Sequence, residues 1–403
     1  MAPPAGWSAV SLCEVATRIT GRNVTGNENV LTISARDGLI SQEEFFHKRV
    51  ASSDTRQYFL LHPGDFVYSK SYSEGHPVGV IRRLRGAEDG VVSPLYICFR
   101  PDLRIVDERF IEYYLTSGVV DDQIAWIAKE GSRNHGLLNV GVDDFMSIPI
   151  SLPPIEEQRR IAEILEALDH QLGVSKGVIE KGETVRKVIL GNLLEEQHWE
   201  VCALGEVATI SSGSTPLRSR SDYWHSGSVP WVKTGEVNFL TIASTQESIT
   251  PMAIRETGMR IYPVGAVIVA MYGEGATRGR SAILGIPAAV NQACAAIICH
   301  ADRLDPEYLL EYLRHKYCDI RAIGHGSNQT NLNSALLSML PIAVPPPRRQ
   351  ERIVSCAKDI DERLTAESLQ LSKYIMFKQG LMNDLLTGQV RVTAGGVEHV
   401  GTG

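Results

Sequence analysis

The chain has 403 residues, of which 43% are hydrophobic and 22% charged, and these ordinary globular values exclude wholesale disorder. The formal net charge of −7 excludes a uniformly basic DNA-coating protein of the histone type, although a chain that gathers its basic residues on one face could still bind DNA. The apolar runs fall short of the roughly 18 residues of a membrane span, and seven cysteines without regular spacing indicate a reducing, cytoplasmic compartment.

Residues 1–152 and 200–345 are each expected to form a globular domain of mixed α/β structure. Alternating apolar residues predict a strand at 95–99 in the first domain and at 265–271 in the second. One amphipathic helix is predicted in each domain, ending in Glu-Tyr-Tyr-Leu and in Glu-Tyr-Leu, respectively.

Each domain is followed by a segment with the pattern of a long helix, residues 153–199 and 346–390. Both begin with a Pro-Pro pair, which suits a helix start, and apolar residues then recur at spacings of four and three for roughly five heptads. Polar or small residues interrupt the two series, at Ser175, Gly182, Arg186, Glu367 and Lys378. The pattern predicts that the helices pack as an antiparallel coiled coil. Two helices that each pack on their own domain are the alternative.

The two halves of the chain repeat each other at an offset of 192 residues, for example from 12 to 204. The matches at this offset are Leu12–Thr17 with Leu204–Thr209, Pro149–Pro154 with Pro341–Pro346, Gln158 with Gln350, and Asp169 with Asp361. Such a period is too long for a solenoid, whose units run about 20–50 residues, and it indicates a tandem duplication with pseudo-twofold symmetry. Because the domain interiors have diverged, the pattern predicts one scaffold that carries two different readers, followed by a tail at 391–403.

Three motifs give the chain a family resemblance. The first is Leu204-Gly-Glu-Val-Ala-Thr-Ile-Ser-Ser-Gly-Ser-Thr-Pro216, followed by Tyr223-Trp224 and Val229-Pro-Trp231. The others are the helix start at 152–169 and the segment Lys378-Gln-Gly-Leu-Met-Asn-Asp-Leu-Leu-Thr-Gly388. Together they resemble the DNA specificity (S) subunit of type I restriction-modification systems over nearly the whole chain. The first reader departs from the pattern, with Arg18-Ile-Thr-Gly-Arg22 where the Gly-Ser-Thr-Pro element would begin.

The resemblance implies a non-catalytic subunit in which each reader binds one half of an asymmetric, bipartite DNA target. It implies that the paired helices fix the spacer between the half-sites, that two methyltransferase (M) subunits clasp the chain, and that restriction motor-nuclease (R) subunits then join. No cofactor is expected in this chain, whereas S-adenosylmethionine, ATP and Mg²⁺ are expected in the partner subunits.

DNA reading needs cations for phosphates and Arg, Asn or Gln for base edges, and loops rich in these residues occur in both readers. The candidates in the first reader are Lys70, Tyr72, Arg82, Arg83, Arg133 and Asn134. The candidates in the second reader are Ser214, Thr215, Arg218, Arg220, Lys233, Tyr272, Arg278, Arg280, Asn328, Gln329 and Asn331. The expected partner-binding residues on the helices are Gln158, Arg160, Leu193, Leu194, Gln350, Arg352, Leu385 and Leu386.

Two other functions remain open from the residues alone: an enzyme with an unrecognised active site, and a helical scaffold that only dimerises its partners. Cys294, Cys299 and His300 lack the paired cysteines of a zinc site, and no nucleophile elbow, methyltransferase or nuclease motif is recognisable. The Arg-, Asn- and Gly-rich loops favour DNA binding, because scaffolding alone would not require them in both domains.

Overall fold

The computed structural model describes residues 3–34, 38–48, 52, 54–71, 75–128, 138–195, 199–273, 276–323, 332–393 and 396–399. The chain forms two compact units, one of Met1–Ser175 with Gln370–Gly403 and the other of Lys176–Leu369. Each unit contains one reader and part of both long helices. Within the described ranges, no helix is long and apolar enough to cross a membrane.

The first reader is built on a four-stranded antiparallel sheet in the order β2-β9-β6-β7. Its strands are β1 (Ser8–Ser11), β2 (Ala16–Arg18), β3 (Leu31–Ser34), β4 (Gly38–Ser41), β5 (Phe59–Leu61), β6 (Phe66–Ser69), β7 (Val80–Arg83), β8 (Gly90–Val92), β9 (Ile97–Pro101) and β10 (Pro149–Leu152). Its helices are α1 (Leu12–Val15), α2 (Gln42–Phe46), α3 (Glu108–Thr116), α4 (Asp121–Ile127) and α5 (Val142–Met146). The pairs β1–β10, β3–β4 and β5–β8 form separate two-stranded sheets.

The second reader has a five-stranded sheet in the order β12-β19-β16-β17-β14 and a three-stranded sheet in the order β15-β13-β18. Its strands are β11 (Glu200–Ala203), β12 (Ala208–Ser212), β13 (Val229–Val232), β14 (Thr241–Ile242), β15 (Glu247–Ile249), β16 (Val267–Ala270), β17 (Ser281–Leu284), β18 (Ala289–Val290), β19 (Cys294–Cys299) and β20 (Pro341–Val344). Its helices are α7 (Leu204–Val207), α8 (Pro251–Thr257), α9 (Pro306–His315), α10 (Tyr317–Ala322) and α11 (Ser334–Ser338), with the 3₁₀ turns η1 (Ser221–Tyr223) and η2 (Thr234–Glu236).

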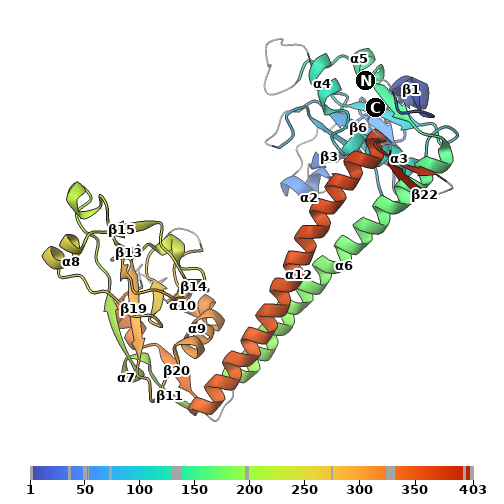
Figure 1. The fold of residues 1–403 in the computed structure, drawn as a ribbon. Coiled ribbons are helices and arrows are strands. Elements are labelled where there is room, and N and C mark those ends of the chain that lie inside the picture. The colour runs from blue at the N-terminus through green and yellow to red at the C-terminus, as the bar shows by residue number, and fades with distance from the viewer. Residues whose placement is uncertain are drawn as a thin grey trace. The chain divides into compact units, whose positions relative to one another are not determined.

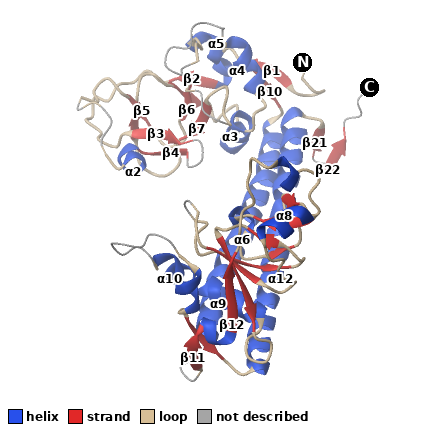
Figure 2. Cartoon of the chain, turned by 90° about the vertical axis from the view of Figure 1, so that its left-hand side faces the viewer, coloured by secondary structure: helices blue, strands red, loops and turns tan. Residues whose placement is uncertain are grey.

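The two amphipathic helices predicted from the sequence are α3 and α9. Each begins after an aspartate, Asp107 or Asp305, whose carboxylate accepts two backbone N–H groups of the first turn, as an N-cap should. The apolar face of α3 is buried in the first core, and that of α9 in the second. Helix α9 lies against the five-stranded sheet (Figure 2). In each reader one amphipathic helix thus packs its apolar face into the core.

The two long helices are α6 (Ile155–Leu194) and α12 (Pro347–Thr387), which run side by side in opposite directions (Figure 1). In the first unit Ile161 and Leu165 of α6 share a core with Leu385 and Leu386 of α12. In the second unit Leu190 and Leu194 of α6 share a core with Ile353, Val354 and Ala357 of α12. The predicted antiparallel packing is confirmed, because the start of each helix lies on the end of the other.

Most of the residues that interrupt the apolar series lie on the seam. Ser175 and Arg186 are buried, and Lys378 is largely shielded. At Gly182 an added Cβ would lie 2.5 Å from a methyl carbon of Leu364, so the absence of a side chain lets the two helices approach. The seam therefore continues through positions that hydrophobicity alone would exclude.

The tandem duplication is confirmed at the level of hydrogen-bonded register. Strand β1 pairs with β10 through Ser8 opposite Leu152, and β11 pairs with β20 through Glu200 opposite Val344. Both pairs of positions differ by 192 residues, the offset found in the sequence. The fold is thus a mixed α/β tandem duplication, as predicted.

Two buried glutamines attach the long helices to the readers. Gln158 Oε1 accepts the Asp107 N–H at 2.8 Å, and its Nε2 donates to the carbonyl oxygens of Pro153 and Ile105. Gln350 makes the same three bonds in the second unit, with Asp305, Pro345 and Arg303. The expectation that these glutamines bind a partner is corrected, because both are 1% exposed and their side chains are occupied within their own chain.

The segment that follows α12 forms a hairpin of β21 (Val390–Thr393) and β22 (Gly396–His399). Arg391 makes a two-pronged ion pair with Glu157 of α6, at 2.7 Å for both Nε and Nη2. The indole Nε1 of Trp7 donates to the same carboxylate at 3.3 Å. The two ends of the described chain therefore meet at the first turn of α6.

Candidate nucleic-acid interface

In the second reader, several loops with candidate residues leave the five-stranded sheet at one edge. Strands β12 and β16 both run antiparallel to β19, and β17 runs antiparallel to β16. The carboxyl ends of β12 and β16 therefore lie at the same edge as the amino ends of β17 and β19. The loops 213–220 and 271–280 begin there, and Phe239 of a third loop donates its N–H to the Ser281 carbonyl at 2.6 Å. We call this the reading edge of the second reader.

Arg218 is the candidate whose position is best defined by its contacts. Its guanidinium carbon lies 3.7 Å from the centroid of the Trp224 ring and 5.0 Å from that of Trp231, as in cation–π contacts. One nitrogen, Nη1, donates to Glu247 at 2.5 Å. The side chain is 54% exposed, and no residue in the described part of the chain bonds its Nε or Nη2. Arg218 is thus held in place with two donor groups open to a ligand.

Two neighbouring cations are more fully neutralised. Arg220 lies between Asp222 and Glu256 and over the Tyr223 ring. Lys233 Nζ donates to Glu247 at 2.8 Å, so this carboxylate serves both Lys233 and Arg218. These two hydrogen bonds lower the pKa of Glu247 and keep it charged. Arg220 therefore has less capacity for an anionic ligand than Arg218.

Five other candidates of the second reader lie in the two loops that begin at this edge. Tyr272 is 38% exposed, whereas Arg278 is half-buried and donates from Nη2 to the Arg321 carbonyl of α10. Arg280 is half-buried, with an Nε that has no partner in the described part of the chain. The Ser214 backbone bonds Val290 and Trp231, and the buried Thr215 hydroxyl is unpartnered among the described residues.

In the first reader, the equivalent edge carries Lys70 and also Arg18, which the sequence analysis did not select. Lys70 follows β6 and Arg18 ends β2, and both strands run antiparallel to β9. Lys70 Nζ donates to the Val140 carbonyl at 2.8 Å, and burial followed by the nearby Arg18 charge lowers the pKa of Lys70. Arg18 is exposed, with no ion-pair partner in the described ranges. Two cations that repel each other mark this edge as a place where a phosphate would be stabilised.

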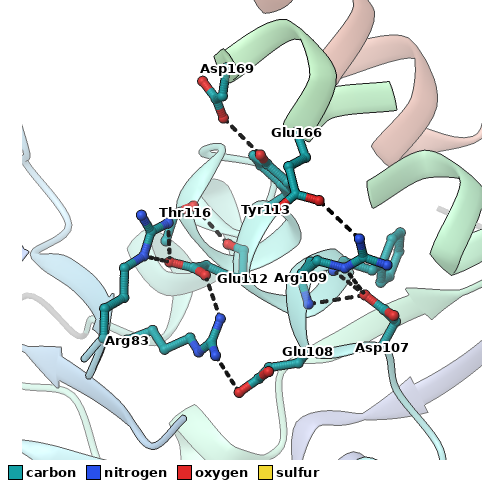
Figure 3. A network of polar contacts seen from close by, with 11 residues as sticks. Arg83, Asp107, Glu108, Arg109, Glu112, Tyr113, Thr116, Glu166 and Asp169 are labelled. Carbon is teal, nitrogen blue, oxygen red and sulfur yellow. Dashed lines mark hydrogen bonds and ion pairs between the residues drawn. The ribbon is translucent and has the colours of Figure 1, made fainter. Parts of the chain in front are cut away.

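Arg82 and Arg83 lie at the other end of the sheet, so their assignment to DNA contact is corrected. Arg83 pairs with Phe66, the first residue of β6, and its side chain is 17% exposed. It forms ion pairs with Glu108 and Glu112 of α3 (Figure 3). Arg82 is half-buried, and its Nη1 donates to the Ile81 carbonyl. Arg83 thus holds α3 on β7.

Six DNA candidates fall outside the described residues: Tyr72, Arg133, Asn134, Asn328, Gln329 and Asn331. Of the predicted partner contacts, Arg352 is exposed, and Arg160 and Leu193 are half-buried. Leu194, Leu385 and Leu386 are buried in the two cores, so their assignment to a partner is corrected. The described residues contain no cluster of His, Cys, Asp or Glu that could hold a metal ion.

Comparisons with known proteins agree with the arrangement of two readers. The family model for the type I restriction modification DNA specificity domain matches residues 73–181 and 196–373. The specificity subunit of the type I restriction enzyme MjaVIII from Methanocaldococcus jannaschii is 25% identical over 336 residues, which cover 75% of this chain and 75% of that protein.

Solved structures show the same fold. The crystal structure of the HsdS subunit from Thermoanaerobacter tengcongensis gives a TM-score of 0.53 at 18% identity, over 96% of this chain and 98% of that one. A chain from a structural study of complex assembly and conformational transition in the type I R-M system gives a TM-score of 0.65 at 18% identity, over 96% and 99% of the two chains.

Proposed function

The chain belongs to the type I restriction modification DNA specificity family, whose role is DNA sequence recognition, and we propose that it reads a bipartite, asymmetric target. In this proposal each reader binds one half-site, and the pair of long helices sets the spacer between them. The chain directs a methyltransferase and a restriction motor-nuclease and does not itself catalyse a reaction. S-adenosylmethionine, ATP and Mg²⁺ belong to those partners.

The observation that carries the proposal is the reading edge present in each half of the duplicated fold. In the second reader this edge presents Arg218, ordered by two indole rings, and in the first reader it presents Lys70 and Arg18. The frames that hold these residues are equivalent, whereas the loop sequences differ. Two different loop sets on equivalent frames are suited to two different half-sites, and this supports an asymmetric target.

Exposed apolar residues on the long helices support a pair of identical partners. On α6 they are Val178, Val185, Val188 and Ile189, each between 37% and 56% exposed. On α12 they are Leu369, Ile375, Met376 and Phe377, each between 39% and 66% exposed. Val185 and Phe377 differ by 192 residues and occupy equivalent positions. Exposed apolar surface around this shared position on each helix would serve two copies of one protein, and we assign it to the methyltransferase subunits.

The charge of the readers bears on the strength of DNA binding. Residues 201–345 hold 11 basic and 11 acidic residues, and residues 1–152 hold 15 basic and 19 acidic residues. Neither reader therefore attracts DNA over long distances by its net charge. We expect the isolated chain to bind weakly, and the partner subunits to supply much of the phosphate contact.

The proposal is tested by comparing methylated bases across the genome of a host with and without the gene. We expect the gene to add one motif made of two different half-sites with a fixed spacer. Selection of random duplexes by the chain bound to its methyltransferase partner should recover the same motif. A continuous motif, a symmetric one, or no selectivity over random DNA would contradict the proposal.

A further inference from the structure

A charged contact interrupts the apolar seam in the second unit, where a helix of the reader meets both long helices. Arg186 of α6 donates from Nε and Nη2 to Asp361 of α12, at 2.6 and 2.8 Å. The same Nη2 donates to Glu311 of α9 at 2.7 Å. The side chains of Arg186 and Glu311 are each 11% exposed, so the contact is largely withdrawn from water. We call these three residues the second joint.

The first unit contains a contact of the same construction. Lys378 of α12 donates to Asp169 of α6 at 2.5 Å, and the Tyr113 hydroxyl of α3 donates to the other carboxylate oxygen at 2.7 Å. Figure 3 shows Tyr113 reaching from α3 toward Asp169. The Lys378 side chain is 18% exposed, and its ammonium lies 5.4 Å from the centroid of the Tyr113 ring. We call these three residues the first joint.

The two joints are related by the duplication. Asp169 and Asp361 differ by 192 residues, and so do Arg186 and Lys378. Glu311 and Tyr113 each lie six residues after the N-cap aspartate of their helix, at 305 and 107. In both joints a seam aspartate binds a cation from the opposite long helix, and a polar side chain of the reader helix completes the contact. The reader residue differs in chemistry and in its partner, since Tyr113 donates to the aspartate whereas Glu311 accepts from the arginine.

Both joints specify one register of α6 against α12. From the first joint to the second, the position on α6 advances by 17 residues, from 169 to 186, and that on α12 goes back by 17, from 378 to 361. A slip of one heptad would place Lys378 opposite Ala162 or Lys176, and Arg186 opposite Val354 or Ser368. None of these four residues could neutralise a shielded cation. The apolar contacts of the seam, in contrast, would be replaced by other apolar contacts after such a slip.

We propose that the two joints fix the register of the long helices and hold each reader helix on them, and thereby restrict the protein to one spacer length. A polar contact in an otherwise apolar coiled coil is well suited to specify register. The six joint residues are then positioning residues for spacer specificity, without any contact to DNA. This proposal rests on the proposed function, because it presumes that the chain reads two half-sites.

The test replaces each joint by apolar residues in the full chain bound to its methyltransferase partner. Asp169→Leu with Lys378→Met removes the first joint. Arg186→Met with Asp361→Leu and Glu311→Met removes the second, and Arg314→Met is added because Arg314 of α9 also donates to Asp361 at 3.1 Å. Binding is measured on duplexes whose spacer is shortened or lengthened by one base pair at a time. We expect the parent to prefer one spacer by about tenfold or more, and each variant to lower this preference to about threefold or less.

A folded variant with the spacer preference of the parent would overturn the proposal. The control is Lys358→Met, which breaks a 2.6 Å ion pair between α12 and Glu307 of α9 that lies off the seam and is exposed on both sides. It should leave the spacer preference unchanged. If the parent itself shows no preference for any bipartite duplex, the proposed function fails instead, so the two failures are distinguishable.

Register is also measured without DNA, by cysteine cross-linking. Gly182→Cys with Leu364→Cys joins positions that touch in the observed register, and Gly182→Cys with Leu371→Cys joins positions one heptad out of register. With peptide mapping of the disulfides, we expect the parent to cross-link only the first pair and the joint variants to cross-link both. Cross-linking restricted to the first pair in every variant would also overturn the proposal.

Discussion

At the scale of single residues, Arg218 is the arginine most clearly arranged to contact a ligand. Stacking on Trp224 and one bond to Glu247 fix the guanidinium before DNA arrives, and two donor groups remain open. An arginine prepared in this way suits the N7 and O6 acceptors of guanine. We expect Arg218→Ala to weaken binding to the second half-site by about 1–3 kcal/mol and to relax base preference there.

The matched control for Arg218 is Arg303→Ala, which removes the same charge from the same reader. Arg303 follows the carboxyl end of β19, at the opposite edge of the sheet, and bonds Glu200 at 2.8 Å. Titration of the DNA should give equal affinities for this variant and the parent. Equal losses in both variants would mean that general charge, and not a defined contact, explains the effect of Arg218.

The buried glutamines give a prediction about stability. Gln350→Leu would leave one N–H and two carbonyl groups without their bonds beneath α9, and Gln158→Leu would do the same beneath α3. Because unsatisfied buried polar groups are costly, we expect each variant to lose about 2–4 kcal/mol of unfolding free energy. Denaturant unfolding measures the loss. Gln370→Leu, at an exposed helix position, should change stability by less than about 0.5 kcal/mol.

At the scale of elements, the sequence predicted the helices well because their periodicity extends over many turns. The same reasoning misjudged the interruptions, since hydrophobicity does not recognise that Arg186 can occupy a seam position when Asp361 and Glu311 neutralise it. It also assigned Arg83 and Lys70 to the same DNA-binding region, because Lys70 begins the loop between β6 and β7 and Arg83 follows that loop. Antiparallel pairing of β6 with β7 carries the two residues to opposite ends of the sheet. Proximity in the sequence thus identified the basic segments but not the end of the sheet at which each residue lies.

The attachment of the C-terminal hairpin to α6 predicts a dependence on pH. Burial raises the pKa of Glu157, but the Arg391 guanidinium, the Val392 N–H and the Trp7 indole outweigh burial, so that the pKa falls below its ordinary value. The carboxylate therefore stabilises the fold above the unfolded pKa of about 4.3, and this contribution is lost as the pH falls through the folded pKa.

We expect Glu157→Gln to lower the unfolding free energy at pH 7 by about 3–5 kcal/mol, because it removes the carboxylate that pairs with the shielded Arg391. The difference from the parent should shrink as the pH falls below about 4. Denaturant unfolding at several pH values gives both results. Glu156→Gln is the neighbouring exposed control, and a difference that is constant with pH would contradict the assignment.

At the scale of the whole molecule, an internal repeat predicted more than any single motif. The offset of 192 residues recurs in the paired strands, in the buried glutamines and in the seam aspartates. The offset is kept where an element has to fit the scaffold, and it is lost inside the readers. The positions of the reading residues could not be predicted, because they depend on strand ends and loop contacts that differ between the readers.

The duplication predicts that one reader can take the place of the other. In a chain whose residues 200–344 are replaced by a second copy of 8–152, the boundary strands keep their register, and Gln350 meets the same backbone groups as Gln158 does. We expect this chain to fold and to select a symmetric target, with the first reader's half-site present as an inverted repeat. The reason is that, under the pseudo-twofold symmetry predicted from the sequence, two identical readers would read the two DNA strands in opposite directions. Duplex selection with the methyltransferase partner tests this, and a target that stays asymmetric would show that the helices contribute base contacts of their own.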